Sequence, residues 1–140
     1  MDTKRITEEL IKAHKTNNPF DIADKLGIIV LYSFMKNTLG FFSTYKRSKF
    51  IHLNNSIPEK LQTFVCAHEL GHAIMHPDVN TPFLKRHTLL STDKIERQAN
   101  SFAVELLMPD SYLSENCDFG IYALANSLGI PKKLVDLKRV

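Results

Sequence analysis

Cysteine is scarce in this sequence, which argues against a fold held together by disulfide bonds. Cys66 and Cys117 are the two cysteines among 140 residues, and they form neither a CxxC pair nor the dense pattern of a small secreted scaffold. Cys66 lies two positions before His68, so on a helix their side chains lie on opposite sides. We expect both thiols to be free.

The sequence also lacks a long apolar run and a large net charge. No stretch approaches the roughly 20 apolar residues that span a bilayer, and residues 1–15 carry charges where a secretory signal peptide has an apolar core. We therefore expect a cytoplasmic protein without a membrane segment. A net charge of +3 is too small to predict nucleic-acid binding by itself.

The remaining composition is typical of one globular domain. Hydrophobic residues make up 44% of the chain and charged residues 24%, and 140 residues suffice to build a substantial core. We expect a single domain, residues 1–140.

Hydrophobic periodicity and turn residues predict an α+β fold. Apolar residues at helical spacing, bounded by glycine or proline, predict helices at residues 2–15, 20–26, 58–76, 93–108, 110–115, 119–128 and 131–138. Runs of β-branched and aromatic residues predict strands at residues 28–32, 39–45 and 50–54. The expected fold is a small antiparallel sheet of about three strands, packed with a helical, zincin-like core and followed by short C-terminal helices.

Two segments have two interpretations each. The last strand, 50–54, is either an exposed edge that an extended peptide can pair with or a strand with structural pairing only. Residues 78–92 are predicted as a long loop, which is either a lid or binding loop or simple irregular packing.

The sequence HELGH at 68–72 lies within the predicted helix 58–76. Residues four apart lie on one face of a helix, about 6 Å apart along its axis, so His68 and His72 can reach one metal ion. Leu61 and Val65 lie on the same face, and histidines on an apolar face are costly to bury unless a metal binds their nitrogens. A chance spacing on a surface helix is the alternative, and this context disfavours it.

Two neutral imidazoles are suitable ligands for a zinc ion. Glu69 is rotated about 100° from the face of the two histidines. It is therefore predicted as the catalytic carboxylate that takes a proton from the attacking water.

A catalytic zinc takes three protein ligands, and the sequence offers three candidates for the third. His76 lies on the same helix, about 9 Å from the expected metal position and out of reach. Asp78 follows that helix but comes after a proline. Glu96 opens the next helix and is favoured, although Asp93 three positions earlier makes a capping-box role the alternative. Asn100, one turn later, either supports a ligand or simply packs.

The segments HELGHAIMH and IERQANSFAVELLMP together resemble the ImmA/IrrE family of metallopeptidases. The resemblance covers residues 19–109 and rests on HELGH, the further histidine at 76, the ExxAN pattern that begins at Glu96, and LLMP at 106–109. It implies a Zn2+ cofactor, with His68, His72 and Glu96 as ligands in a gluzincin-like arrangement and Glu69 as the catalytic residue.

Several members of that family cut a helix-turn-helix repressor and so release the genes of a phage or mobile element. The resemblance therefore implies an intracellular zinc endopeptidase whose protein substrate is such a repressor. Tyr112 and His87 are the candidates for a residue that stabilises the oxyanion together with zinc.

The C-terminal segment motivates a second hypothesis, a DNA- or protein-binding regulator with a structural zinc. Its sequence LANSLGIPKKLV at 124–135 resembles the start of a helix-turn-helix, and basic residues at 132, 133, 138 and 139 adjoin it. Few residues remain for a recognition helix, however, and terminal lysines are typical of a solvated helix end. We therefore expect no nucleic-acid partner.

Overall fold

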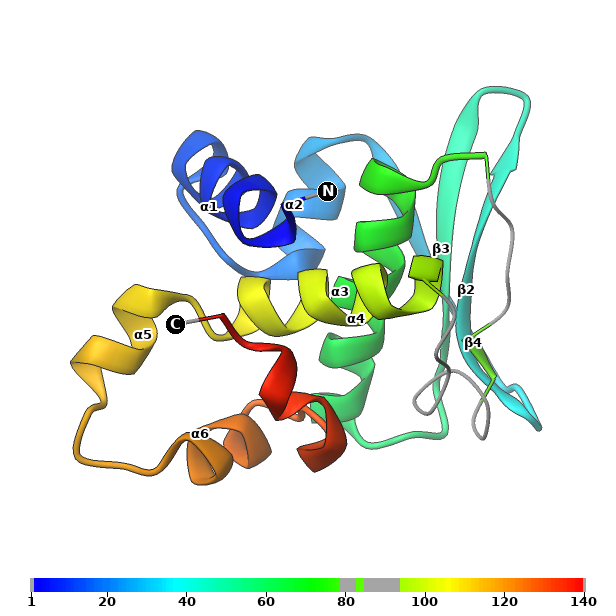
Figure 1. The fold of residues 1–140 in the computed structure, drawn as a ribbon. Helices are drawn as coiled ribbons and strands as arrows, with labels where there is room; N and C mark the ends of the chain where they lie inside the picture. The colour runs from blue at the N-terminus through cyan, green and yellow to red at the C-terminus, as the bar shows by residue number, and fades with distance from the viewer. Residues whose placement is uncertain (1, 79–82, 85–93, 140) are drawn as a thin grey trace.

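The structure is a computed structural model, and it describes residues 2–78, 83–84 and 94–139. Its elements are α1 (Thr3–His14), α2 (Pro19–Lys25), β1 (Ile28–Ser33), β2 (Thr38–Tyr45), β3 (Ser48–Asn54), α3 (Glu59–Met75), β4 (Phe83–Leu84), α4 (Lys94–Leu107), α5 (Asp110–Glu115), α6 (Ile121–Ser127) and the 3-10 helix η1 (Lys132–Leu137). Figure 1 shows the helices gathered on one side of a small sheet. The α+β class predicted from the sequence is confirmed.

The sheet is mixed, with the strand order β1-β3-β2-β4. β2 and β3 form the predicted antiparallel hairpin, whose turn residues Lys46 and Arg47 have positive φ angles of 48° and 71°. β1 pairs with β3 in parallel, because the chain reverses between β1 and β2 and again at the hairpin. Antiparallel pairing therefore holds for β2 with both neighbours but not for β1. Since β3 lies between β1 and β2, the hypothesis that it is an exposed edge strand is wrong.

α3 runs between the sheet and α4, and this position decides its burial (Figure 1). Every residue in the stretch 64–73 is buried, although only one inward face was expected. Phe42 and Ile51 of the sheet belong to the same hydrophobic core as Phe102 and Leu106 of α4. A helix covered from opposite sides is buried all round, so the HELGH segment lies inside the core.

Buried charges hold the C-terminal segment against the helices. Lys138 follows η1, and its Nζ atom donates to Glu105 Oε1 at 2.6 Å and to Asp110 Oδ1 at 2.8 Å. Glu105 Oε2 also accepts from the backbone N–H of Arg139 at 2.8 Å. Lys138 is buried, so its interpretation as part of a solvated helix end is wrong. The reason is Glu105, a buried carboxylate on α4 that needs a cation beside it.

Three further expectations concern the cysteines, the long loop and the membrane. Both cysteines are free, Cys66 buried and Cys117 exposed. Part of the predicted loop 78–92 forms β4, which pairs with β2, and most of the rest lies outside the described residues, so the lid hypothesis is not tested. Among the described helices, none is long and apolar enough to cross a membrane.

Candidate metal centre

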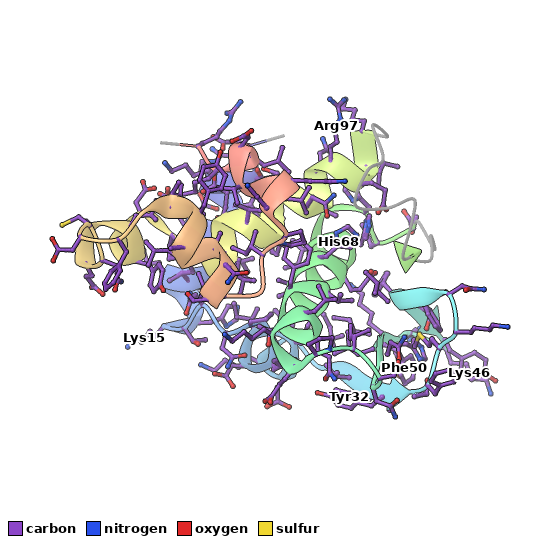
Figure 2. All side chains as sticks on the ribbon, turned by 90° about the horizontal axis from the view of Figure 1, so that it is seen from below. Lys15, Tyr32, Lys46, Phe50, His68 and Arg97 are labelled. Carbon is purple, nitrogen blue, oxygen red and sulfur yellow. The ribbon has the colours of Figure 1, made fainter. Side chains whose placement is uncertain are left out.

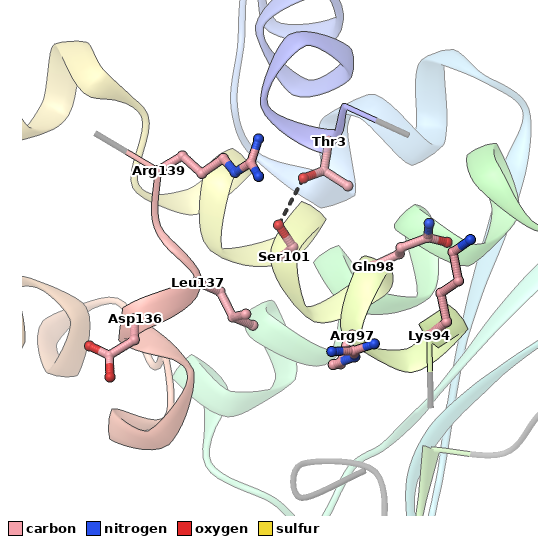
Figure 3. Close-up of a pocket in the computed structure, with 8 residues that line it drawn as sticks. All are labelled: Thr3, Lys94, Arg97, Gln98, Ser101, Asp136, Leu137 and Arg139. Carbon is pink, nitrogen blue, oxygen red and sulfur yellow. Dashed lines mark hydrogen bonds between the residues drawn. The ribbon is translucent and has the colours of Figure 1, made fainter. Parts of the chain in front are cut away.

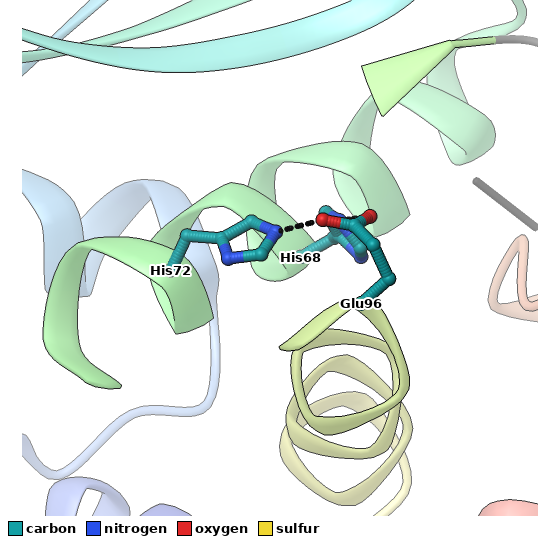
Figure 4. A group of neighbouring side chains, drawn as sticks. All are labelled: His68, His72 and Glu96. Carbon is teal, nitrogen blue, oxygen red and sulfur yellow. Dashed lines mark ion pairs between the residues drawn. The ribbon is translucent and has the colours of Figure 1, made fainter. Parts of the chain in front are cut away.

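Two helices bring the three predicted metal ligands together. His68 and His72 lie one turn apart on α3, and Glu96 lies in the first turn of α4 (Figure 4). The Nε2 atom of His72 lies 2.8 Å from Glu96 Oε1, and the Nε2 atom of His68 lies 3.2 Å from Glu96 Oε2. The ligand atoms lie within 4.8 Å of one another, and all three side chains are buried. At this spacing one ion can contact all three side chains.

The cluster lies in the interior of the molecule. Figure 2 shows His68 among the side chains between the helices, whereas Lys15, Lys46 and Arg97 project at the periphery. The site is therefore set by helix packing and not by surface side chains.

Gly71 allows α4 to approach α3 closely beside the cluster. A Cβ atom on Gly71 would lie 3.0 Å from Cγ and from Cδ1 of the Phe102 ring, which is closer than the separation at which carbon atoms attract. A side chain at this position would therefore require the ring of Phe102 to shift. Gly71 thus lets the ring of Phe102 on α4 pack directly on α3, next to His72.

Asn100 orients His68 from the side of the ring away from the cluster. The Nδ1 atom of His68 donates to Oδ1 of Asn100 at 2.8 Å, because an amide oxygen only accepts. The proton of the neutral ring is then on Nδ1, and the Nε2 lone pair faces the cluster. Of the two interpretations of Asn100, this contact favours support of a ligand.

His72 is contacted by His76, a residue for which the sequence indicated no role. Their Nδ1 atoms are hydrogen-bonded at 3.2 Å, and the Nε2 atom of His76 is hydrogen-bonded to Oε1 of Gln98 at 2.7 Å. His76 was rejected as a third ligand because of its distance from the metal position, and the structure does not place it in the cluster. The signal in the sequence was the repeated spacing of four residues between histidines 68, 72 and 76.

The acceptor atoms of the cluster show that a cation fits there. Burial alone raises the pKa of Glu96, but contacts with the imidazoles of His68 and His72 outweigh burial and lower that pKa to about 2, so the carboxylate is ionised. Apart from these contacts within the cluster, neither Glu96 oxygen nor the Nε2 atom of His72 has a hydrogen-bond partner in the described part of the chain. Buried acceptors without donors are costly, and a cation removes that cost. Two imidazoles and one carboxylate are a ligand set of catalytic zinc.

Glu69 lies beside the cluster without being part of it. Its Oε2 atom lies 3.9 Å from the Nε2 atom of His68, and neither of its oxygens has a hydrogen-bond partner among the described residues. Burial raises the pKa of Glu69 well above its usual range, and the charge of Glu96 raises it further. A carboxyl group with a raised pKa in a dry site is suited to accept and release a proton.

The remaining candidates lie elsewhere. Asp78 is exposed and does not belong to the cluster. Tyr112 lies in α5, which follows the C-terminal end of α4, whereas Glu96 lies in the first turn of α4. There Tyr112 lines a cavity together with the end of α1. His87 and Asp93 lie outside the described residues, so their predicted roles, in oxyanion stabilisation and in helix capping, are not tested.

Comparisons with known proteins agree with this geometry. Residues 23–137 match the model of the Peptidase_M78 family, described as an IrrE N-terminal-like domain. The chain belongs to this peptidase family. It is 44% identical over 138 residues to a protein of Bacillus phage phi105 described as an uncharacterized immunity region protein 2, with 96% of this chain and 87% of the relative covered. It is 32% identical over 141 residues to the metallopeptidase ImmA of Bacillus subtilis (strain 168), with 96% of this chain and 82% of the relative covered.

The resemblance to the ImmA/IrrE family is thus confirmed. Membership of a metallopeptidase family implies a metal and a protein substrate. His68, His72 and Glu96 lie within the matched residues, and in the described part of the chain they form the group of side chains that can hold a metal ion.

Proposed function

We propose that this protein is a zinc endopeptidase that acts inside the cell on a helix-turn-helix repressor of a phage or mobile element. The observation that carries the proposal is the buried cluster of two imidazoles and one carboxylate, with a second carboxylate, that of Glu69, beside it. His68, His72 and Glu96 would hold the zinc ion. When bound, zinc supplies a Lewis acid that polarises the scissile carbonyl and makes a water molecule more acidic.

Glu69 moves the proton in this mechanism. Its carboxylate accepts a proton from the attacking water as the new carbon–oxygen bond forms, and it then gives that proton to the leaving nitrogen as the carbon–nitrogen bond breaks. Because Glu69 is fully buried, bulk water does not compete for this proton.

The proposed substrate draws its support from the relatives. One is described as an immunity region protein of a phage and another as a metallopeptidase, and together these descriptions favour proteolysis in the control of phage or mobile-element genes. A repressor of such genes acts inside the cell, so its peptidase must do the same.

The alternative function is a DNA- or protein-binding regulator with a structural zinc. The exposed pair Lys132 and Lys133 favours it. Two observations weigh against it. A structural zinc is usually closed by four protein ligands, and the cluster in the described residues offers three. The element after α6 is a 3-10 helix of six residues with Leu134 and Val135 buried, which is a poor recognition helix for a major groove.

The test uses the purified full chain and a helix-turn-helix repressor identified from the neighbouring genes. We expect about one zinc per chain by elemental analysis, cleavage of the repressor, loss of cleavage with a zinc chelator, and recovery when zinc is added back. A titration on nonspecific duplex DNA at low salt should show no binding. Absence of zinc and of zinc uptake would contradict the peptidase, and duplex binding without cleavage would favour the regulator.

A further inference from the structure

We infer that His76 and Gln98 form a relay that positions His72 for metal binding, with Gln98 acting through His76. The relay runs from Gln98 on α4 to His76 at the end of α3 and on to His72 in the cluster. It rests on the metal site proposed above. Both relay residues are positioning residues, because neither belongs to the cluster of ligand atoms.

The direction of each hydrogen bond follows from the acceptor at the end of the relay. Gln98 Oε1 is a carbonyl oxygen and only accepts, so His76 donates from Nε2. A neutral His76 then has a lone pair on Nδ1, and the proton between the two Nδ1 atoms must belong to His72. A neutral His72 with its proton on Nδ1 presents the Nε2 lone pair to the cluster. One amide oxygen on α4 thus selects the tautomer of a ligand on α3.

The last turn of α3 places the rings of His72 and His76 beside each other. His76 is the C-cap of the helix, with φ −133° and ψ 57°, and its backbone N–H still bonds to the carbonyl of His72. The ring of His76 lies 5.3 Å from the ring of His72, centroid to centroid, as is usual for side chains four residues apart on a helix.

The surroundings of Gln98 allow its side chain to be exchanged. Gln98 is half-buried and borders a cavity of about 320 Å³ on α4, between α1 and the C-terminal segment (Figure 3). Replacement of its amide by a carboxylate or by an apolar group of similar size therefore needs no repacking of the core. This separates an effect on the relay from an effect on the fold.

The test measures zinc affinity by competition with a chromophoric chelator, so it does not depend on cleavage. His76→Phe keeps the ring but removes the acceptor, and Gln98→Leu removes the terminal oxygen. We expect His76→Phe to weaken zinc binding by about 10- to 100-fold, the usual range for a residue that hydrogen-bonds to a metal ligand. Gln98→Leu should weaken it by up to about tenfold, because His76 still contacts His72. Gln98→Glu keeps an oxygen acceptor and should retain the affinity of the parent.

A double variant separates the relay from general disturbance of the site. Because Gln98 acts through His76, the variant with both His76→Phe and Gln98→Leu should bind zinc no more weakly than His76→Phe alone. The matched control is Gln62→Leu, since the side chain of Gln62 on α3 donates, among the described residues, to the backbone carbonyl of Ile57 and its loss should leave affinity unchanged.

Three outcomes overturn the relay: unchanged affinity in Gln98→Leu and His76→Phe, full additivity in the double variant, or a loss in Gln98→Glu as large as that in Gln98→Leu. If the parent itself binds no zinc, the proposed metal site fails and not merely the relay. The two failures are therefore distinguishable.

Discussion

Glu96 has two possible roles, and one substitution separates them. As a metal ligand, Glu96→Ala leaves two imidazoles, and zinc affinity should fall by more than the roughly 10- to 100-fold that loss of an outer partner costs. As a helix cap alone, Glu96→Ala would cost about 0.5 to 2 kcal/mol of stability and leave zinc binding intact. The contacts of 2.8 and 3.2 Å with the imidazoles favour the ligand. Chelator competition on the purified variant measures the difference.

Asp78→Ala is the control for this measurement. Asp78 is the other carboxylate that the sequence offered as a third ligand, and it is exposed and outside the cluster. Its loss should leave zinc affinity within about twofold of the parent, as for a surface substitution. Retention of zinc in Glu96→Ala together with its loss in Asp78→Ala would show that the site closes through the segment after α3.

The residues that the sequence predicted best are those related by local geometry. His68 and His72 were predictable because the spacing of four residues on a helix fixes their separation. Glu96 was favoured because it opens the next helix, but a capping role stayed open because two helices can pack in many ways. The contact between His76 and Gln98 was missed, since it depends on where α3 ends and on the register of α4 against it.

At the scale of elements, the types were predictable and the neighbours were not. Runs such as 28–32 carry the pattern of a strand in their own residues, and β1 occurs there. The residues of a strand do not determine by themselves which strand pairs with it, so the parallel pairing of β1 with β3 was not predicted. The burial of α3 on all sides likewise follows from its place between the sheet and α4, not from its periodicity.

The attachment of the C-terminal segment to α4 gives a prediction at this scale. Lys138→Met leaves the buried carboxylate of Glu105 without its cation, which should lower the free energy of unfolding by about 3 to 5 kcal/mol. Replacement of both partners, Lys138→Met with Glu105→Leu, should recover most of that loss, because an apolar pair needs no counter-charge. Urea denaturation of the variants measures both values.

Lys133→Met is the matched control, because Lys133 is an exposed lysine of the same segment. It should stay within about 0.5 kcal/mol of the parent, as a surface substitution does. A Lys138→Met variant as stable as this control would show that the buried ion pair does not hold the segment in place.

At the scale of the whole molecule, the site is part of the core. The two histidines lie on a helix between the sheet and α4, and α4 supplies both Glu96 and the aromatic ring that packs on Gly71. Metal binding and packing of the two helices therefore stabilise each other. The sequence predicted this site through its motif, and in the structure the glycine of that motif lies against the ring of Phe102.

In the proposed mechanism, Glu69 carries out proton transfer at a zinc site of which it is not a ligand. The direct measurement is the rate of repressor cleavage by Glu69→Gln and by the parent, each loaded to the same zinc content. We expect Glu69→Gln to bind zinc as the parent does and to cleave about 10² to 10⁴ times more slowly, the usual contribution of general acid–base catalysis. A Glu69→Gln variant that cleaves within about tenfold of the parent, or one that no longer holds zinc, would contradict it.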